Sequence, residues 1–428
     1  MQRVSGFQGF QAPVYNHPVE ILIVGGGIGG LSLALSLHQV GVACRVFEAA
    51  PQMRPLGVGI NILPHGAREL VELGLEAPLA RVAVETREMC AVNRFGQFIF
   101  REPRGRFAGY SWPQWSIHRA DLHQVLMDAV LERLGPQAVV TGKKCVDVAQ
   151  SERSVTLHFV DGSRATGDAA IGCDGIHSAL RKNFFPRGSG LLYQGINVWR
   201  GVTRWKPFLT GASMIIGGWL EVGKLVVYPI RRDPDAQGLQ LLNWVAEIQS
   251  PRNVMQDWNL PGKLEDFLPT FESWRFDWLD VPAMMRAAEA IYEYPMVDRE
   301  PLASWTRGRI ALLGDAAHPM YPRGSNGAGQ AILDARVLAS SFKKYPDPLA
   351  ALKNYEAIRL GPANEVVLAN RSSGPDSILR TVHERTGDRP FERIEDVISS
   401  EEIRAISDNY KRVAGFERDS LAKRPSLL

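Results

Sequence analysis

A run of glycines near the N-terminus could bind a phosphate group. Residues 25–30 are GGGIGG, so Gly25, Gly27 and Gly30 have the spacing G-x-G-x-x-G, with Ile28 and Gly29 between them. In this pattern the first glycine permits a tight turn, the second lets the backbone approach a pyrophosphate, and the third lets a helix pack closely on a strand. The N-terminus of the helix that follows offers free N–H groups and a partial positive charge to the phosphate.

The elements around these glycines support a dinucleotide site. A strand pattern spans residues 20–24, a helical pattern spans 31–40, and a second strand pattern spans 43–47 and ends at Glu48. An acid at this place can accept hydrogen bonds from a ribose diol. We therefore favour a dinucleotide over a glycine turn that merely packs a helix. NAD, NADP and FAD all remain open at this point.

A second glycine-rich segment favours FAD. An apolar strand pattern at 309–313 leads into Gly314 and Asp315, a loop follows, and helical spacing resumes at Gln330. Asp315 at the end of that strand would lie near the ribitol or ribose hydroxyls of an extended dinucleotide. The loop glycines, which include Gly324 and Gly327, would expose backbone N–H groups beside a helix N-terminus, and this is an anion site. Such a site would stabilise the N1–C2=O edge of a reduced flavin.

A third motif follows another buried strand. Residues 169–173 form an apolar strand pattern that enters Asp174 and Gly175, and the spacing continues as Asp174-Gly175-x-x-Ser178-x-x-Arg181 into a short helix.

These three motifs, in this order, resemble the signature set of the single-component, class A flavoprotein aromatic hydroxylases. The resemblance covers nearly the whole chain except the N-terminal arm and the C-terminal tail. Four shorter stretches are similar to the phenazine hydroxylases of that family that act on 5-methylphenazine-1-carboxylate: RPLGVGIN at 54–61, SIHR at 116–119, WRGVT at 199–203 and YPMVDR at 294–299. Salicylate hydroxylases are a more distant likeness.

The resemblance implies where FAD would lie. Asp315 would contact its ribityl and pyrophosphate region, Asp174 and Gly175 would serve both FAD and NAD(P)H, and Arg119 would help to hold FAD. Pro322 and the backbone of 324–328 would lie against the isoalloxazine ring, and 57–60 would pass its other edge. The cofactor-binding candidates are thus Gly25, Gly27, Ile28, Gly29, Gly30, Glu48, Gly59, Arg119, Asp174, Gly175, Gly314, Asp315, Gly324, Gly327 and Ala328.

The resemblance also implies a reaction. NADH or NADPH would reduce FAD, O2 would add to give a C4a-hydroperoxyflavin, and an aromatic or N-heteroaromatic ring would be hydroxylated, with loss of CO2 if the attacked carbon carries a carboxylate. The chemistry belongs to the cofactor, so no catalytic triad or carboxylate pair is required. The alternatives are an FAD-dependent oxidase or reductase without oxygen transfer, and a non-catalytic FAD-binding redox sensor. A halogenase is disfavoured because Trp-x-Trp-x-Ile-Pro is absent.

The candidate catalytic residues are Pro322, Arg323 and Tyr228. Arg323 stands where the phenazine hydroxylases have an apolar residue; it could pair with a substrate carboxylate, or it could be a solvated loop arginine. Tyr228, His65 and Tyr321 are conceivable substrate bases, although each is better explained as a packed aromatic residue or a surface histidine. We interpret His318 as structural, because no second ligand lies at helical spacing from it.

The fold class expected is α/β: a Rossmann-like FAD-binding domain with an inserted β-sheet substrate domain and a C-terminal helical tail. Helical spacing is also seen at 65–79, 120–134 and 348–371. Seven of the ten tryptophans lie between 199 and 278, and we expect most of them to fill the sheet core. The FAD-binding domain would comprise 1–85, 111–187 and 295–374, the substrate domain would comprise 86–110 and 188–294, and a tail over 375–428 would wrap the surface.

Composition narrows the class of partner. The chain of 428 residues has 49 basic and 46 acidic residues, a balance that favours neither nucleic acid nor a membrane surface as a partner. The four cysteines lack metal or redox spacing, so no metal is expected, and they are typical of reduced thiols in a cytoplasmic protein. Residues 1–18 lack a secretory core, and five glycines interrupt the apolar stretch at 21–37, so we expect no membrane span. A small aromatic substrate and a monomer or homodimer are expected.

Overall fold

Three strands of one parallel sheet end where the three motifs begin. In the computed structural model, which describes residues 19–52, 57–185, 190–249, 260–372 and 374–428, Val24, Gly172 and Leu312 lie side by side in register. Because the strands are parallel, their carboxyl ends meet at one edge of the sheet, which brings the motifs together. The sheet order is β21 (Thr306–Arg307), β22 (Ile310–Leu312), β12 (Ala169–Gly172), β1 (Glu20–Val24), β2 (Ala43–Phe47) and β8 (Val139–Val140).

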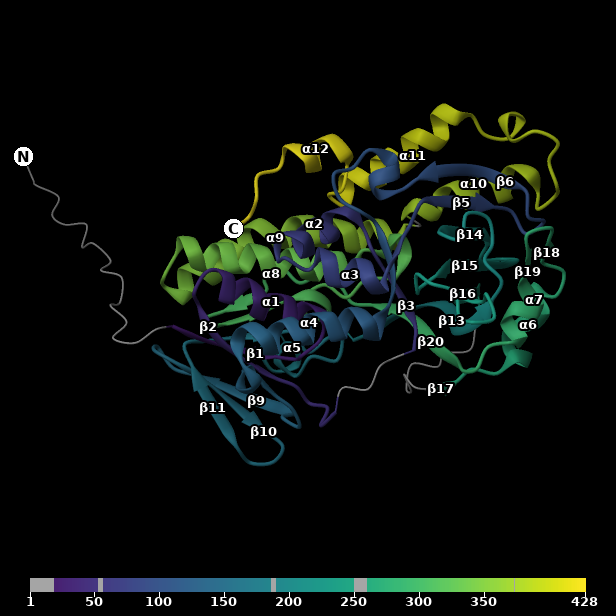
Figure 1. Ribbon diagram of the computed structural model, residues 1–428. Helices are drawn as coiled ribbons and strands as arrows, with labels where there is room; N and C mark the ends of the chain where they lie inside the picture. The colour runs from purple at the N-terminus through teal and green to yellow at the C-terminus, as the bar shows by residue number, and fades with distance from the viewer. Residues whose placement is uncertain (1–18, 53–56, 186–189, 250–259, 373) are drawn as a thin grey trace, which may run out of the picture.

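Helices cover both faces of this sheet (Figure 1). They are α1 (Ile28–Gln39), α2 (Pro64–Glu72), α3 (Glu76–Val82), α4 (Arg119–Leu134), α5 (Ala179–Phe184), α8 (Gly327–Lys344) and α9 (Pro348–Arg371). The predictions of helices at 31–40, 120–134 and 348–371 are confirmed, although α1 begins three residues earlier, directly after the glycine turn. The single helix predicted over 65–79 is wrong, because Gly74 adopts a φ of 75° and separates α2 from α3.

Two small antiparallel sheets flank the main sheet. One has the order β11 (Arg164–Gly167), β10 (Val155–Phe159) and β9 (Cys145–Gln150); the other has the order β3 (Gly59–Ile62), β7 (Trp115–His118) and β4 (Val84–Glu85).

An eight-stranded sheet forms the other half of the molecule. Its order is β17 (Leu260–Pro261), β20 (Ile291–Asp298), β13 (Leu192–Trp205), β16 (Gln240–Gln249), β15 (Gly223–Pro229), β14 (Ser213–Trp219), β5 (Glu88–Val92) and β6 (Phe98–Pro103). β5 pairs with β14 in parallel, so residues 88–103 complete a sheet built mainly from residues 192–298. Helices α6 (Leu264–Phe271) and α7 (Val281–Arg286) and the short strands β18 (Arg275–Phe276) and β19 (Leu279–Asp280) lie beside it.

Side chains alternate between the two faces of this sheet. On β15, Leu225 and Val227 join a buried aromatic core with Trp244 and Trp274, whereas Val226 belongs to the opposite face. This alternation is expected because successive residues of a strand point to opposite sides. The expectation that the tryptophans mostly fill the core is confirmed: Trp199, Trp219, Trp244 and Trp274 are buried.

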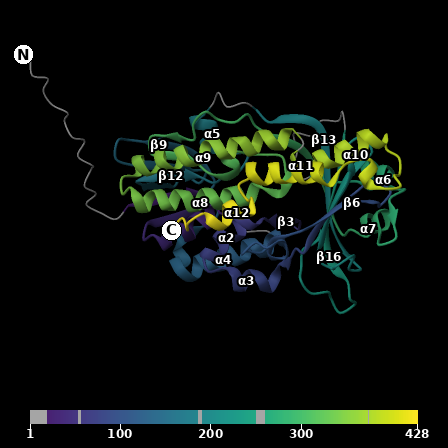
Figure 2. The same cartoon turned by 90° about the horizontal axis from the view of Figure 1, so that it is seen from above.

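The C-terminal tail joins the two halves. It is helical as predicted, with α10 (Ser377–Thr386), α11 (Ser400–Val413) and α12 (Arg418–Lys423), but it is not confined to the surface. Seen from two sides, these helices run from the α/β half to the eight-stranded sheet (Figures 1 and 2). Ile378 and Leu379 of α10 pack with Ile216 and Trp219 of β14, and Tyr410 of α11 is 6% exposed.

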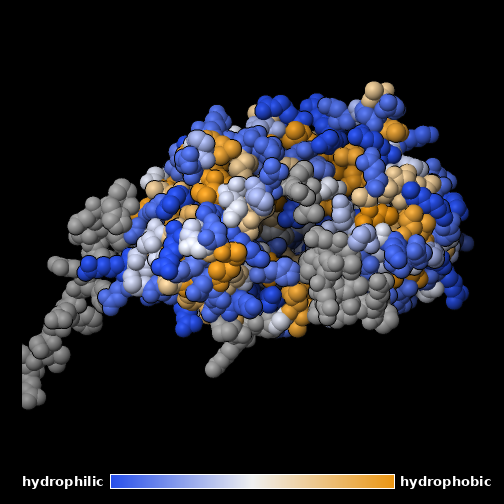
Figure 3. All heavy atoms as spheres, turned by 90° about the horizontal axis from the view of Figure 1, so that it is seen from below, coloured by the Kyte–Doolittle hydropathy of each residue, from blue (hydrophilic) through white to orange (hydrophobic). Residues whose placement is uncertain are grey.

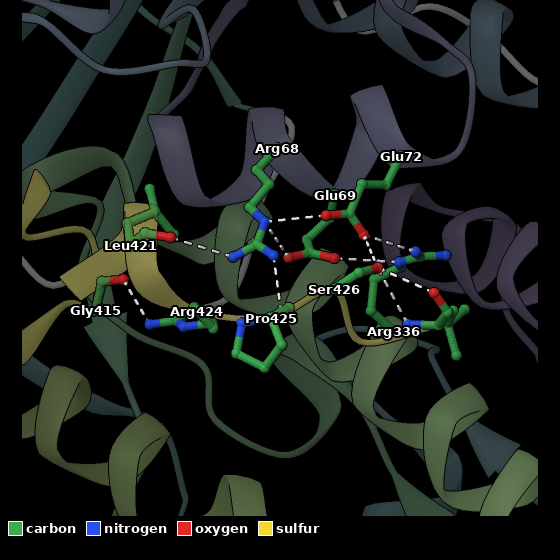
Figure 4. A network of polar contacts seen from close by, with 10 residues as sticks. Arg68, Glu69, Glu72, Arg336, Gly415, Leu421, Arg424, Pro425 and Ser426 are labelled. Atoms are coloured by element: carbon green, nitrogen blue, oxygen red, sulfur yellow. Dashed lines mark hydrogen bonds and ion pairs between the residues drawn. The ribbon is translucent and has the colours of Figure 1, made fainter. Parts of the chain in front are cut away.

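Polar contacts anchor the end of the tail on α2 (Figure 4). The Arg68 guanidinium donates hydrogen bonds to the carbonyl oxygens of Leu421 and Pro425, at 3.3 and 2.8 Å. The Ser426 hydroxyl donates to Glu72 at 2.7 Å, and Glu72 also pairs with Arg336 of α8 at 3.3 Å. The tail is thus held to two helices of the α/β half.

One face of the molecule is of mixed polarity. The face in Figure 3 intersperses hydrophobic and hydrophilic residues and is hollowed near its centre. No helix within the described ranges is long and apolar enough to cross a membrane.

Candidate active site

A single cavity of about 710 Å³ joins the three motifs to the eight-stranded sheet. Its size lies in the range of small-molecule and cofactor sites. The predicted site residues that line it are Gly25, Gly27, Ile28, Gly29, Glu48, Gly59, Arg119, Asp174, Gly175, Tyr228, Gly314, Asp315, Pro322, Arg323, Gly324, Gly327 and Ala328. Gly30 is the one predicted site residue that does not line the cavity, since it packs behind the turn.

The glycines of the first turn differ in what a Cβ would meet at each position. Gly25 has a φ of 107°, and a Cβ on it would lie 2.4 Å from the carbonyl oxygen of Cys173. A Cβ on Gly30 would lie 2.0 Å from the carbonyl oxygen of Gly25, whereas one on Gly27 would meet no atom within 4 Å. Gly27 precedes α1, whose first turn has no acidic residue and no side-chain cap. The helix N-terminus is therefore free to receive a pyrophosphate, and the residues fit one.

Glu48 is held firmly at the edge of the cavity. Its Oε2 accepts a hydrogen bond from the N–H of Gly26 at 2.7 Å, and its Oε1 accepts one from Ala50 at 2.8 Å. Each oxygen keeps a further lone pair, so the carboxylate can still accept a bond from a ribose hydroxyl.

Asp315 and Arg119 bring opposite charges to the middle of the cavity. The side chain of Asp315 is accessible although Gly314 and Ala316 on either side of it are buried. Burial lowers the pKa of Arg119, and the negative charge of Asp315 opposes that shift. One group is an acceptor for hydroxyls and the other is a donor for phosphate or ring oxygens, as an extended dinucleotide requires.

Asp174 supports the third turn as well as lining the cavity. Its Oδ2 accepts the N–H of Ala179, the first residue of α5, at 2.7 Å. Burial raises the pKa of Asp174, and hydrogen bonds from Ser178 and from the start of α5 oppose the rise. Gly175 has a φ of 73°, and a Cβ on it would meet nothing within 4 Å.

Arg323 is buried, which corrects the alternative of a solvated loop arginine. It is 5% exposed, its Nη1 donates to the carbonyl oxygens of Asn370 and Arg371 at 3.2 and 3.4 Å, and its Nε lies 3.7 Å from Asp376. Nη1 of the guanidinium is thus engaged by the protein, whereas Nε has no hydrogen-bond partner among the described residues.

The flavin-loop candidate Gly324 rests on the tail. It has a φ of 68°, and a Cβ there would lie 1.9 Å from the Tyr410 hydroxyl. That hydroxyl accepts a hydrogen bond from the Asn326 amide at 2.7 Å and donates one to Asn370 Oδ1 at 2.8 Å. Through Tyr410, the tail thus holds the loop that carries Gly324 in place.

Tyr228 and Tyr321 both line the cavity, but neither is suited to act as a base. Burial raises the pKa of both phenols, which favours the protonated form, although the guanidinium of Arg200 opposes the rise at Tyr228. Tyr228 is thus a hydrogen-bond donor at neutral pH. None of the tryptophans within the described residues lines the cavity, so the idea that some of them form an aromatic pocket is not supported.

His318 and His65 both have structural positions. His318 is buried, and its Nε2 lies 2.5 Å from Asp334 Oδ2, which agrees with the structural interpretation. His65 is not among the residues that line the cavity. Its buried ring stacks on Phe416 with centroids 5.6 Å apart, so neither the proposal of a substrate base nor that of a surface histidine holds.

We expect His65 to make the protein sensitive to acid. Burial, with help from Arg424 and Arg359, lowers the pKa of His65 to about 3. The unfolded chain binds this proton near pH 6.5, so stability falls as the pH drops from about 6.5 towards 3. Between pH 7 and pH 4.5, the free energy of unfolding should therefore fall by about 2 to 3 kcal/mol less in His65→Leu than in the wild type. Melting temperatures at both pH values measure this, and an equal loss in both proteins would contradict it.

Several lining residues were missed by sequence reasoning. They come from the eight-stranded sheet, from the connection between β6 and β7, and from the tail: Arg104, Gln114, Arg200, Lys224, Glu247, Asp376, Ser407, Tyr410, Lys411 and Phe416. A usable signal existed for two of them, since Lys224 and Glu247 are charged residues within apolar strand segments, where charge is costly unless paired.

Comparisons with known proteins identify the family of the chain. The model of the FAD binding domain family matches residues 18–190 and 290–369. Phenazine 1,6-dicarboxylic acid hydroxylase PhzS of Lysobacter antibioticus is 42% identical, over 82% of this chain and 89% of its own length. 3-Amino-4-hydroxybenzoate 2-monooxygenase PtnB3 of Streptomyces platensis is 34% identical, over 96% and 99%.

Solved structures show the same fold. HpxO of Klebsiella pneumoniae, complexed with FAD and uric acid, has a TM-score of 0.73 at 24% identity and covers 95% of this chain and 97% of its own. A salicylate hydroxylase substrate complex has a TM-score of 0.72 at 22% identity, over 95% and 99%. The predicted fold class, with its FAD-binding α/β part, inserted sheet and helical tail, is confirmed. The chain is therefore an FAD-dependent aromatic monooxygenase that uses NAD(P)H and O2, and it belongs to the class A flavoprotein hydroxylase family.

Proposed function

We propose that the substrate is a fused N-heteroaromatic carboxylic acid of the phenazine type. The observation that carries this proposal is the apolar wall that the eight-stranded sheet presents to the cavity. Alternate residues of neighbouring strands form it, among them Met89, Phe100, Met214, Ile216 and Val226. An apolar wall of this kind suits a planar polycyclic ring. The 42% identity to a phenazine 1,6-dicarboxylic acid hydroxylase supports the same choice.

The FAD-binding roles are part of the proposal. Gly27 and the N-terminus of α1 would hold the pyrophosphate, Glu48 a ribose diol, and Asp315 with Arg119 the ribityl region. The isoalloxazine ring would lie between 57–60 and the loop from Pro322 to Ala328. When bound, FAD accepts hydride from NADH or NADPH and lets its reduced ring activate O2 for transfer of one oxygen atom. The protein orients the substrate ring and excludes water.

The catalytic roles follow from the surroundings of each candidate. Tyr228 would donate a hydrogen bond near the edge formed by Gly59, whose N–H donates to Asn243 at 2.7 Å and whose carbonyl accepts from Arg200 at 2.9 Å. Pro322 would pack against the ring, and Arg323 would act as a positioning residue for the flavin loop. No proton transfer is assigned to Arg323.

A carboxylate of the substrate has a better partner in Arg104. Arg104 and Lys411 both line the cavity, and both form ion pairs with Glu102. The distance between Arg104 and Glu102 is 3.0 Å. The second partner of Lys411, Asp408, is largely exposed and therefore contributes little charge to the interior. Arg104 Nε is buried and has no hydrogen-bond partner in the part of the chain that the structure describes. This end of the cavity is therefore net positive and suits an anion.

Arg104→Met is expected to raise KM for aromatic acids at least tenfold, because a charge-assisted bond of about 1.5–3 kcal/mol is lost. The KM for the corresponding carboxamides should change less than threefold. Steady-state NAD(P)H oxidation measures both values, and an equal rise for acids and amides would contradict the assignment.

The proposal extends to the setting of the enzyme. We infer a cytoplasmic monomer or homodimer that acts on a small aromatic substrate without nucleic acid or membrane as a partner. The near-balance of 49 basic and 46 acidic residues and the four free cysteines support this inference. Sedimentation of the holoenzyme at two protein concentrations tests the oligomeric state.

The decisive experiment measures NAD(P)H oxidation and oxygen consumption by the yellow holoenzyme, with mass analysis of products. Phenazine carboxylic acids are compared with hydroxybenzoates and hydroxynicotinates. We expect the phenazine acids to give the highest kcat/KM and a product that has gained one oxygen atom, with or without loss of CO2. Preference for a single-ring acid would overturn the substrate class. NAD(P)H oxidation without any oxygenated product would indicate an oxidase or reductase, and FAD binding without turnover would indicate a sensor.

A further inference from the structure

A buried cluster of four charged residues lies on the wall of the cavity, away from the glycine turns. It consists of Lys224 on β15, Glu247 on β16, Asp376 at the start of the tail and Arg323 in the flavin loop, and all four line the cavity. Lys224 Nζ lies 2.9 Å from Glu247 Oε1 and 2.7 Å from Asp376 Oδ2. Each of the four residues is at most 5% exposed.

The sheet register explains why these charges meet. Lys224 and Glu247 are directly opposite one another on neighbouring antiparallel strands, and the next pair on the same face is Val226 with Val245. The cluster therefore lies directly beside the apolar pair Val226 and Val245 on the face that lines the cavity. Buried ion pairs of this kind rarely add net stability, because desolvation offsets their attraction. Their position on the cavity wall favours a role towards a ligand.

The charges of the cluster balance, but its hydrogen bonds do not. Burial would lower the pKa of Lys224, but Asp376 and Glu247 outweigh this and raise it, so the lysine remains a cation. Two cations thus face two carboxylates, and a further anion would not be favoured here. Among the described residues, Glu247 Oε2 and Arg323 Nε are both buried without a hydrogen-bond partner, but Arg323 Nε still faces the carboxylate of Asp376 at 3.7 Å. A buried carboxylate oxygen left unpaired is costly, and a ligand that donates a hydrogen bond removes that cost.

We propose that Glu247 is the specificity-determining residue of the substrate site, and that its free Oε2 accepts a hydrogen bond from a hydroxyl, amino or ring N–H group of the aromatic substrate. Lys224 and Asp376 hold the carboxylate in place, and the carboxylate end of the substrate lies at Arg104. The enzyme thus prefers aromatic acids that already carry a donor group. This inference deepens the proposed function and rests on it.

The test uses binding, read as the change in the visible FAD spectrum of the oxidised holoenzyme. The probes are two matched pairs: 7-hydroxyphenazine-1-carboxylate with phenazine-1-carboxylate, and 3-hydroxybenzoate with benzoate. In the wild type, the hydroxyl compound of each pair should bind at least tenfold more tightly, because a site built to receive a donor rejects the analogue that lacks it. No preference for the hydroxyl in either pair would overturn the inference without any variant.

The variant Glu247→Gln should reduce this preference to less than threefold while FAD content remains unchanged. Glu88→Gln is the matched control: Glu88 lies on β5 of the same sheet, does not line the cavity, and should leave the preference intact. If Glu247→Gln does not retain FAD, Glu247→Asp keeps the charge but shortens its reach and should also weaken the preference. A full preference in a folded Glu247 variant would overturn the assignment.

Failure of the proposed substrate class and failure of the role of Glu247 give different results. If the hydroxyl preference is seen only with the benzoate pair, Glu247 acts as proposed but the phenazine-type substrate class is wrong. If phenazine acids bind and are oxygenated but the hydroxyl makes no difference, the proposed function stands and the role of Glu247 fails.

Discussion

Replacing Gly27 with alanine is expected to weaken FAD binding at least tenfold while leaving the stability of the apoprotein within about 0.5 kcal/mol of the wild type. A Cβ at Gly27 meets no protein atom within 4 Å, so only a group that approaches the backbone from the cavity is obstructed. Gly30→Ala should instead destabilise the apoprotein by about 3 kcal/mol or more and abolish measurable FAD binding, because its Cβ would lie 2.0 Å from the Gly25 carbonyl oxygen.

Two measurements separate these effects: FAD titration of the apoprotein and thermal melting without FAD. Gly361→Ala is the control, since Gly361 lies within α9 and a Cβ there meets nothing within 4 Å. Because Gly361 precedes Pro362, alanine there gains no helix stability, but it should leave FAD affinity unchanged. Equal FAD affinity in Gly27→Ala and the wild type would show that no pyrophosphate approaches this turn.

Asp334→Ala is expected to destabilise the holoenzyme by about 3–5 kcal/mol, because it leaves a buried guanidinium without its carboxylate. Asp334 is fully buried, its Oδ1 lies 2.7 Å from Arg359 Nε, and its Oδ2 accepts the N–H of Gly314 at 3.1 Å in addition to contacting His318. The carboxylate thus ties α8 and α9 to the turn that carries Asp315. We expect kcat/KM to fall more than tenfold as that turn shifts.

The same residue gives a pH signature. Burial would raise the pKa of Asp334, but His318 and Arg359 outweigh it and lower the pKa to about 2. Its stabilising contribution is therefore complete above about pH 4, the unfolded value, and is lost as the pH falls towards 2. The stability of Asp334→Ala should therefore not show this decrease between about pH 4 and pH 2. Glu402→Gln, which removes an exposed pair with Arg385, should change the melting temperature little. Equal effects of both substitutions would contradict the account.

Local motifs were the predictable part of this molecule. The strand, glycine turn and helix at 20–39 and again at 310–344 lie within short stretches, so hydrophobic period and glycine spacing identify them. The assembly of the motifs was predictable too, because parallel strands place their carboxyl ends at one edge. The FAD-binding part and the inserted sheet followed from these rules.

Contacts between distant segments were the unpredictable part. Lys224 forms an ion pair with Asp376, which lies in the tail. Arg323 is held by the backbone of α9 and by the same aspartate. His65 is buried because Phe416 covers it. No local pattern in the sequence encodes such pairings, so the tail was interpreted as a surface wrap although it supplies part of the cavity wall.

The interleaving of the eight-stranded sheet limits how genes of this family can recombine. β5 belongs to residues 88–92 and its parallel partner β14 to residues 213–219, so a single exchange point between them would pair a strand of one parent with a strand of the other. The tail adds a third dependent segment through Asp376 and Lys224. A recombinant keeps the substrate pocket of one parent intact only when these three separated stretches come from that parent.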